Sequence, residues 1–361
     1  MKNAKRTLAL LLALVMSLSL LAGCGDQNGN TSGGNTASDT PLVVGYAPFS
    51  SKFSPFFSET AYDQDVWVMT QLGLLTSDRT GAIIYKGIEG ETIDYGPTDL
   101  EVTENADGTV YYDFTLRDDL KFSDGEPLTI DDVIFSMYVL CDPTYEGNST
   151  LYAQPIQGME AYRSGMSARQ NLILAAGPDG YSANDNYTED QYNTFWAAFN
   201  AAGVKFAQEI LDYLVAAGAN AETDSVAAKA ANWGFSLADD ATVEDFWAAI
   251  VEKYGYDLSD DGINAEKASS SISELLTAEL GDRAGEFSAG VQTGESAANI
   301  SGIQKTGDYS MRIVMTKVDA VAIYQLGVTI APMHYYGDKS LYDYDNNSFG
   351  FPKGDLSSVR A

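Results

Sequence analysis

The sequence predicts an α/β fold in which a helix-rich block interrupts a sheet-forming region. Apolar and polar residues alternate at 110–116 and again at 309–315, which is the period of strands with one buried face. From 166 to 298 alanine is abundant, and apolar residues recur at the three- and four-residue spacing of helices. Because strand-forming sequence lies on both sides of it, this block is predicted to be an inserted helical domain.

Length, charge and composition exclude several classes of protein. The 361 residues are 45% hydrophobic, so the chain can bury a substantial core, and two domains are favoured over one. The net charge of −30 excludes the broad basic face that binding to nucleic acid requires. One histidine and two cysteines are too few for a zinc site built from those residue types. We therefore predict no nucleic-acid partner, no metal site and no cofactor.

Residues 1–23 have the pattern of a secretory signal peptide. Three cations precede the apolar run Leu8–Ala22, which is shorter than the roughly 20 apolar residues of a membrane-spanning helix. The next residues, 24–41, are rich in Gly, Asn, Ser and Thr, and they are predicted to form a flexible tether. A short opening strand is predicted at 42–46, followed by a loop at 47–57.

A helix and a hairpin are predicted after this loop. The helix covers 63–75, and its apolar face contains Val66 and Met69, with Leu72 and Leu75 continuing the spacing. The hairpin joins Leu100–Thr103 to 110–116 through a turn at 105–108, and its buried face is formed by Val110, Tyr112, Phe114 and Leu116.

Two further helical regions are predicted from start and stop signals. Thr129 and Asp132 form a capping-box pattern before a helix from about Ile130 to Leu140. Within the block, four glycines are predicted to lie at helix ends, namely Gly203, Gly218, Gly255 and Gly281. Strand pairing resumes after the block through a turn at 306–308.

No residue is predicted to be catalytic. Asp257, Ser259 and Asp261 imitate the start of a calcium-binding loop, but the position that must supply a glutamate is Ala268. His334 is the single imidazole and has no nucleophile motif nearby, so a structural or partly buried histidine is expected. Cys141 is expected to be a buried, inert thiol.

The segment from Phe114 to Ser136 resembles the signature of the family 5 extracellular solute-binding proteins of bacteria. The matching residues are Leu116-Arg117, Lys121-Phe122-Ser123-Asp124-Gly125 and the helix start Thr129-Ile130-Asp131-Asp132-Val133, where Ile130 replaces a common alanine. Four other segments are similar to the family in the same order, namely Leu42–Phe56, Ile156–Gly165, Ile300–Met315 and Ile330–Gly337.

This resemblance implies a domain organisation of the type II periplasmic-binding-protein kind. Residues 42–164 and 299–361 would form the first lobe, and 165–298 the helical insertion. The family's second lobe would be absent, so the chain is expected to be the N-terminal portion of a longer protein. The insertion is expected to be either a docking domain or a decoration.

The run Leu21-Ala22-Gly23-Cys24 resembles the lipobox of bacterial lipoproteins. The resemblance implies cleavage before Cys24, lipid attachment to its thiol, and anchoring on the outer face of the cell membrane. The alternative is an ordinary signal peptide that contains a cysteine by chance.

The family resemblance also implies a binding function without a catalysed reaction. The protein would capture oligopeptides or dipeptides outside the membrane and deliver them to the permease subunits of an ABC importer. Tyr46, Ser50, Phe53 and Ser54, in the loop after the first strand, are the candidate ligand-binding residues, and the alternative is that the aromatic residues pack in the core. Other family ligands, such as nickel, haem or an oligosaccharide, stay open, as does a secreted lipoprotein enzyme such as a carboxylate-pair glycosidase.

Overall fold

The computed structural model describes residues 44–45, 48–58, 60–88 and 96–360. The predicted signal peptide, Cys24, the tether and Tyr46 lie outside the described residues. The chain divides into two units, Met1–Tyr46 and Ala47–Ala361, and the second unit is the one described below.

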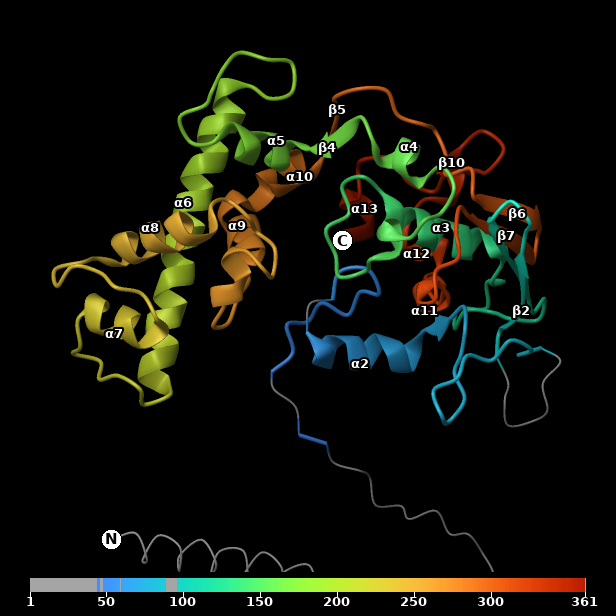
Figure 1. The fold of residues 1–361 in the computed structure, drawn as a ribbon, viewed down its shortest axis with the longest axis horizontal. Coiled ribbons are helices and arrows are strands. Elements are labelled where there is room, and N and C mark those ends of the chain that lie inside the picture. Colours follow the sequence, from blue (N-terminus) through green and yellow to red (C-terminus); the bar gives the residue numbers. More distant parts are fainter. Residues whose placement is uncertain (1–43, 46–47, 59, 89–95, 361) are drawn as a thin grey trace, which may run out of the picture. The chain divides into compact units, whose positions relative to one another are not determined.

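The second unit contains both helices and strands, and its longest run of helices without a strand is α5 to α10 (Figure 1). The helices are α2 (Ala61–Thr70), α3 (Ile130–Cys141), α4 (Met159–Arg163), α5 (Arg169–Ala176), α6 (Glu189–Ala216), α7 (Val226–Trp233), α8 (Val243–Tyr254), α9 (Ile272–Leu280), α10 (Ala284–Ser288), α11 (Ala322–Leu326), α12 (Met333–Tyr336) and α13 (Ser357–Arg360). The strands are β1 (Leu72–Gly73), β2 (Thr98–Glu104), β3 (Val110–Leu116), β4 (Met166–Ala168), β5 (Gly290–Gln292), β6 (Ile303–Gly307), β7 (Ser310–Met315), β8 (Thr329–Ile330), β9 (Tyr342–Asp343) and β10 (Ser348–Phe349).

The main sheet has four strands in the order β2-β3-β7-β6, and all its pairs are antiparallel. Both predicted hairpins are confirmed, and β3 joins them because Phe114 pairs with Leu100 on one side and Met311 on the other. The alternation of β3 is also confirmed, since Val110, Tyr112, Phe114 and Leu116 are all buried. Strands from the two sides of the helical block therefore form one sheet, and the predicted α/β class is confirmed.

Helix α3 packs its apolar residues into the core of this sheet region, which we define as the described residues of 48–164 and 299–360. The predicted capping box of Thr129 and Asp132 is present at its first turn. A buried carboxylate near each end of the helix holds the returning chain: Asp132 accepts a hydrogen bond from the backbone N–H of Met333 (3.1 Å), and Asp142 from that of Gly354 (2.8 Å). Burial raises the pKa of both carboxyl groups, although these hydrogen bonds oppose the shift.

The helix predicted at 63–75 exists, but its predicted end is wrong. Helix α2 stops at Thr70 because Gln71 is extended, and Leu72 then pairs with Ile330 as part of a two-stranded sheet. Leu75 is buried, but it belongs to the segment after α2 and not to a helix.

The predicted apolar face of α2 is also wrong. Met69 is 77% exposed, and the buried residue of the helix is Asp63 in its first turn. Because the core contact is made by this first turn and by the strand after the helix, the spacing of Val66 and Met69 does not correspond to a buried face.

The helical block, residues 165–298, has its own hydrophobic cluster, whose residues lie between Ile173 and Phe287. Helix α6, with 28 residues, packs against both α8 and α9 (Figure 1). The chain enters and leaves the block side by side, because β4 pairs with β5 and Met166 faces Gln292.

One of the four predicted helix ends in the block is wrong. Gly218, Gly255 and Gly281 follow helices, but Gly203 lies in the middle of α6. A Cβ atom at Gly203 would lie 1.9 Å from the indole of Trp247. Glycine is required here by close helix packing and not by a turn.

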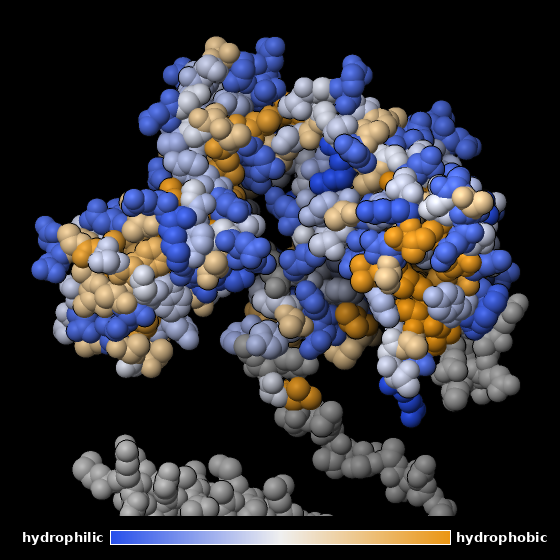
Figure 2. All heavy atoms as spheres, in the orientation of Figure 1, coloured by the Kyte–Doolittle hydropathy of each residue, from blue (hydrophilic) through white to orange (hydrophobic). Residues whose placement is uncertain are grey.

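An exposed apolar patch lies on the sheet region. Figure 2 shows hydrophobic side chains gathered over the part where Figure 1 has α11. Val318, Val321 and Tyr324, in and just before this helix, are all more than half exposed. Within the described ranges, no helix is long and apolar enough to cross a bilayer.

Candidate functional site

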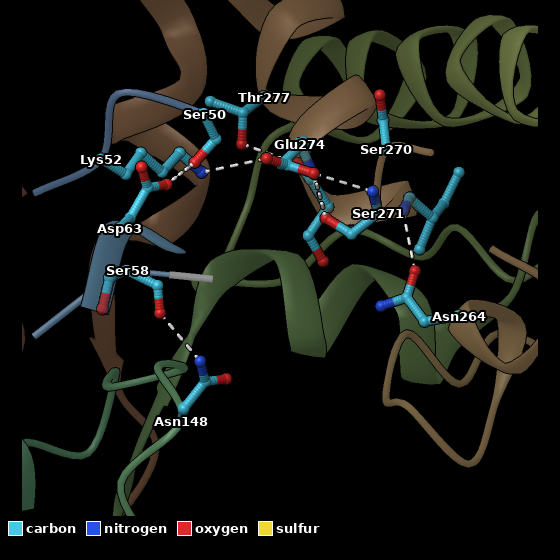
Figure 3. Close-up of polar contacts among 12 residues, drawn as sticks. Ser50, Lys52, Ser58, Asp63, Asn148, Asn264, Ser270, Ser271, Glu274 and Thr277 are labelled. Carbon is cyan, nitrogen blue, oxygen red and sulfur yellow. Dashed lines mark hydrogen bonds and ion pairs between the residues drawn. The ribbon is translucent and has the colours of Figure 1, made fainter. Parts of the chain in front are cut away.

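The predicted ligand-binding residues that the structure describes lie in one loop, residues 48–58, which we call the opening loop. The hydroxyl of Ser50 donates a hydrogen bond to the carboxylate of Asp63, which projects from the first turn of α2 (Figure 3). Burial raises the pKa of Asp63, but hydrogen bonds from Ser50 and Thr60 outweigh this effect and leave it below its usual value. Ser51 has a left-handed backbone, with φ of 66°.

The other side of the opening loop contacts the helical block (Figure 3). The ammonium of Lys52 lies 3.5 Å from one carboxylate oxygen of Glu274, which belongs to α9. The second oxygen of Glu274 accepts hydrogen bonds from the backbone N–H (2.8 Å) and the hydroxyl (3.1 Å) of Ser271. The carboxylates of Asp63 in α2 and Glu274 in α9 therefore contact two nearby residues of the opening loop, Ser50 and Lys52.

The end of the opening loop is fixed to the sheet region. Asn148 donates from its amide to the backbone oxygen of Ser58 (2.8 Å), and the indole N–H of Trp67 donates to the Ser58 hydroxyl (2.8 Å). The Tyr145 hydroxyl donates to the backbone oxygen of Phe56 (2.8 Å), whose ring is buried. These contacts give the loop a fixed base.

The three described candidates differ in their surroundings. Phe53 is 41% exposed and packs edge-on against Phe49 at 5.7 Å, so it does not belong to the core. Ser54 accepts a hydrogen bond from the backbone N–H of Phe56 (3.2 Å) and serves the turn. Ser50 is held by Asp63. Among the described candidates, Phe53 is thus the one whose side chain exposes apolar surface.

Sequence reasoning missed three residues of this site. Asp63 was detectable in principle, because Thr60 precedes it by three positions and caps α2 through the Asp63 backbone N–H (3.1 Å). Lys52 and Glu274 lie far apart in the sequence, and no local pattern links them.

His334 and Cys141, the other residues considered in the sequence, have contacts that fit a structural role. His334 contacts Asp124 at 2.6 Å and packs edge-on against Phe122, which supports the predicted structural role. Cys141 is fully buried, and burial raises the pKa of its thiol. Among the described residues, no group of three or more His, Cys, Asp or Glu side chains is placed to hold a metal ion. A hollow of about 740 Å³ beside α4 is lined by none of the opening-loop residues.

Comparison with known proteins confirms the class predicted from the sequence. The family model described as bacterial extracellular solute-binding proteins, family 5, middle part, matches residues 95–188. This match includes the signature segment Phe114–Ser136 and helix α3. Over this part, the chain is similar in sequence to the family 5 solute-binding proteins, and its structure there contains both helices and strands.

Particular relatives are similar over a limited part of their length. The oligopeptide-binding protein AppA of Bacillus subtilis is 26% identical over 152 residues, which are 41% of this chain and 26% of AppA. The alignment therefore spans about a quarter of the relative.

Two solved structures are also similar over part of the chain. OppA of Burkholderia pseudomallei is 23% identical, with a TM-score of 0.24 and coverage of 31% of this chain and 20% of OppA. OppA of Haemophilus influenzae in complex with RPPGFSPFR is 24% identical, with a TM-score of 0.24 and coverage of 30% and 19%.

Proposed function

We propose that this chain is part of the substrate-binding component of an ABC importer, which captures peptides outside the membrane and delivers them to permease subunits. The observation that carries the proposal is the family 5 match at residues 95–188. The similarity to an oligopeptide-binding protein supports peptides as the ligand class. The protein would bind its ligand without transforming it, which the similarity to solute-binding proteins supports.

The domain organisation is part of the same proposal. Residues 42–164 and 299–361 form one lobe, and 165–298 form an insertion. Two separate hydrophobic clusters and the pairing of β4 with β5 at the base of the block support this division. The ligand lies against the opening loop, with Tyr46, Ser50, Phe53 and Ser54 as its contacts.

The identity of the captured ligand tests this function directly. The whole gene product that carries this chain is purified from its own cells, and bound molecules are identified by mass spectrometry after denaturation. The proposal expects a mixture of short peptides. A single sugar, haem or nickel species in place of peptides contradicts the peptide assignment.

A Phe53→Ala substitution is expected to weaken peptide binding about three- to tenfold, because an exposed aromatic ring loses its apolar contact with the ligand. The measurement is calorimetric titration with a mixed tripeptide library. Leu341→Ala is the control, because Leu341 is 42% exposed, close to the 41% of Phe53, and lies outside the opening loop. Equal affinities of wild type and Phe53→Ala for the peptides would show that Phe53 does not contribute to peptide binding.

A Cys24→Ser substitution is expected to abolish membrane attachment, because the thiol that carries the lipid is lost and stable anchoring needs acyl chains. Labelling with radioactive palmitate and partition into detergent phase measure this effect. Cys141→Ser serves as the control, since Cys141 is fully buried. Unchanged labelling of Cys24→Ser would show that the lipid is attached elsewhere.

A further inference from the structure

The C-terminal segment of the sheet region reaches the base of the helical block. We call residues 350–360 the C-terminal strap, and its last turn is α13. Leu356 and Val359 are 3% and 1% exposed and belong to the hydrophobic cluster of the sheet region. Apolar burial therefore seats the strap on the sheet region, while its backbone and its charged side chains contact other elements.

Gly354 of the strap joins the core of the sheet region to the block. Its N–H donates to the buried carboxylate of Asp142 (2.8 Å), and its carbonyl oxygen accepts from the N–H of Gly290 in β5 (2.6 Å). A Cβ atom at Gly354 would lie 2.5 Å from the sulfur of Met166 in β4. Both strands at the base of the block therefore pack directly on the strap.

Lys353 connects the strap to the chain that leaves the block. Its ammonium donates to the backbone oxygen of Ala297 (2.9 Å) and to the hydroxyl of Ser296. The same ammonium lies 4.1 Å from the centroid of the Tyr162 ring, a distance at which a cation is attracted to an aromatic face. The strap thus contacts the segments through which the chain enters and leaves the block.

The other end of the strap contacts the opening loop. The guanidinium of Arg360 lies 4.3 Å from the centroid of the Phe57 ring and 2.9 Å from one carboxylate oxygen of Glu146. The other oxygen of Glu146 accepts a hydrogen bond from the side-chain amide of Gln170 in α5 (2.9 Å). One short segment therefore contacts both the opening loop and the base of the block.

We propose that the C-terminal strap couples the helical block to the opening loop. In the seated state, which the structure shows, Gly354 holds β5 and Arg360 packs on Phe57. In a lifted state, the contacts with the block and with Phe57 break together, because one short segment makes them all. Local openings of this kind are ordinary equilibria in folded proteins. The coupling does not depend on which ligand the protein binds.

The coupling gives the helical block a role besides decoration. By thermodynamic linkage, an event that shifts the strap at the block also shifts it at the opening loop, and the reverse holds equally. A partner bound to the block would therefore change the opening loop. A ligand held by the opening loop would change the base of the block.

Each end of the strap can be perturbed without altering a residue at the other. Gly354→Ala adds a methyl group against Met166 and disfavours the local backbone, since Gly354 has φ of 81°. Arg360→Met keeps an unbranched side chain but removes the cation from Phe57 and Glu146. Both variants are made in the whole gene product, and hydrogen exchange at both ends is followed by mass spectrometry.

The change at the distant end tests the coupling. We expect Gly354→Ala to accelerate exchange of the hydrogen-bonded amides of Phe56 and Ser58, in the opening loop, about two- to fivefold. Arg360→Met is expected to accelerate exchange of the Gly290 amide about two- to fivefold. The double variant should exchange no faster than the faster single variant, because both substitutions lift the same segment.

Two substitutions serve as matched controls. Gly218→Ala adds a methyl group at φ of 71°, where no atom lies within 4 Å of the new Cβ. Lys339→Met removes a cation from another exposed ion pair of the sheet region, which Lys339 forms with Glu126 at 3.1 Å. Neither control is expected to change exchange in the opening loop or in β5.

The inference is wrong if each single variant changes exchange only at its own end of the strap and the double variant shows the sum of the two effects. If Gly354→Ala loses protection throughout α3, that variant reports unfolding of the sheet region, and Arg360→Met then decides. Faster exchange of the Gly290 amide in Arg360→Met supports the coupling, and unchanged exchange contradicts it.

Discussion

An Asp142→Ala substitution is expected to lower the free energy of unfolding of the sheet region by about 3–5 kcal/mol. Asp142 is fully buried at the end of α3. Its carboxylate accepts hydrogen bonds from the backbone N–H (2.8 Å) and hydroxyl (2.6 Å) of Thr144 and from the backbone N–H of Gly354 (2.8 Å). Alanine leaves three buried donors without an acceptor, and each such group costs about 1–3 kcal/mol.

Hydrogen exchange followed by mass spectrometry measures this effect, because it reports α3 separately from the helical block. Asp107→Ala is a matched control: Asp107 accepts the same pair of bonds from Thr109 (3.0 and 2.6 Å), but in an exposed hairpin turn. We expect little change for Asp107→Ala and faster exchange throughout α3 for Asp142→Ala. Equal protection of α3 in the two variants would contradict the anchoring role of Asp142.

A Gly203→Ala substitution is expected to destabilise the helical block by about 1–3 kcal/mol, although alanine is the better helix former. The added methyl group would overlap Trp247 of α8, since the closest approach to its ring is 1.9 Å. This steric cost exceeds the gain of about 1 kcal/mol that alanine provides in a helix interior. The helices α6 and α8 must separate or the indole must move.

Urea unfolding followed by tryptophan fluorescence measures this loss, because Trp196, Trp233 and Trp247 lie in the block. Gly285→Ala is the matched control, since Gly285 lies in α10 and its added Cβ would meet no atom within 4 Å. Replacing Trp247 by leucine in the Gly203→Ala background should restore part of the stability relative to Trp247→Leu alone. If Gly203→Ala stabilises the block as Gly285→Ala does, the close packing of α6 and α8 is wrong.

Local patterns explain which parts of the fold were predictable. The alternation at 110–116 and the capping box of Thr129 and Asp132 depend on neighbours within a few positions, and both are present. The end of α2 and the position of Gly203 depend on distant partners, namely Ile330 and Trp247. Sequence spacing contains no information on such partners, so these predictions were wrong.

The candidate site was predictable to a smaller extent. The opening loop could be identified by its position in the sequence. Which of its aromatic residues are buried could not be predicted, since Phe53 is exposed and the nearby Phe56 is buried. The contact of Lys52 with Glu274 depends on how the helical block folds back to the loop, which no motif in the sequence records.

Peptide binding by the whole gene product distinguishes the proposed function from its alternatives. Calorimetric titration with mixed di-, tri- and oligopeptides is compared with titration by nickel, haem and oligosaccharides, and polysaccharide turnover is followed in parallel. We expect saturable binding of peptides with a one-to-one stoichiometry and no turnover of polysaccharide. Binding of nickel, haem or an oligosaccharide with no response to any peptide, or sugar hydrolysis that is lost on a single Asp or Glu substitution, would contradict it.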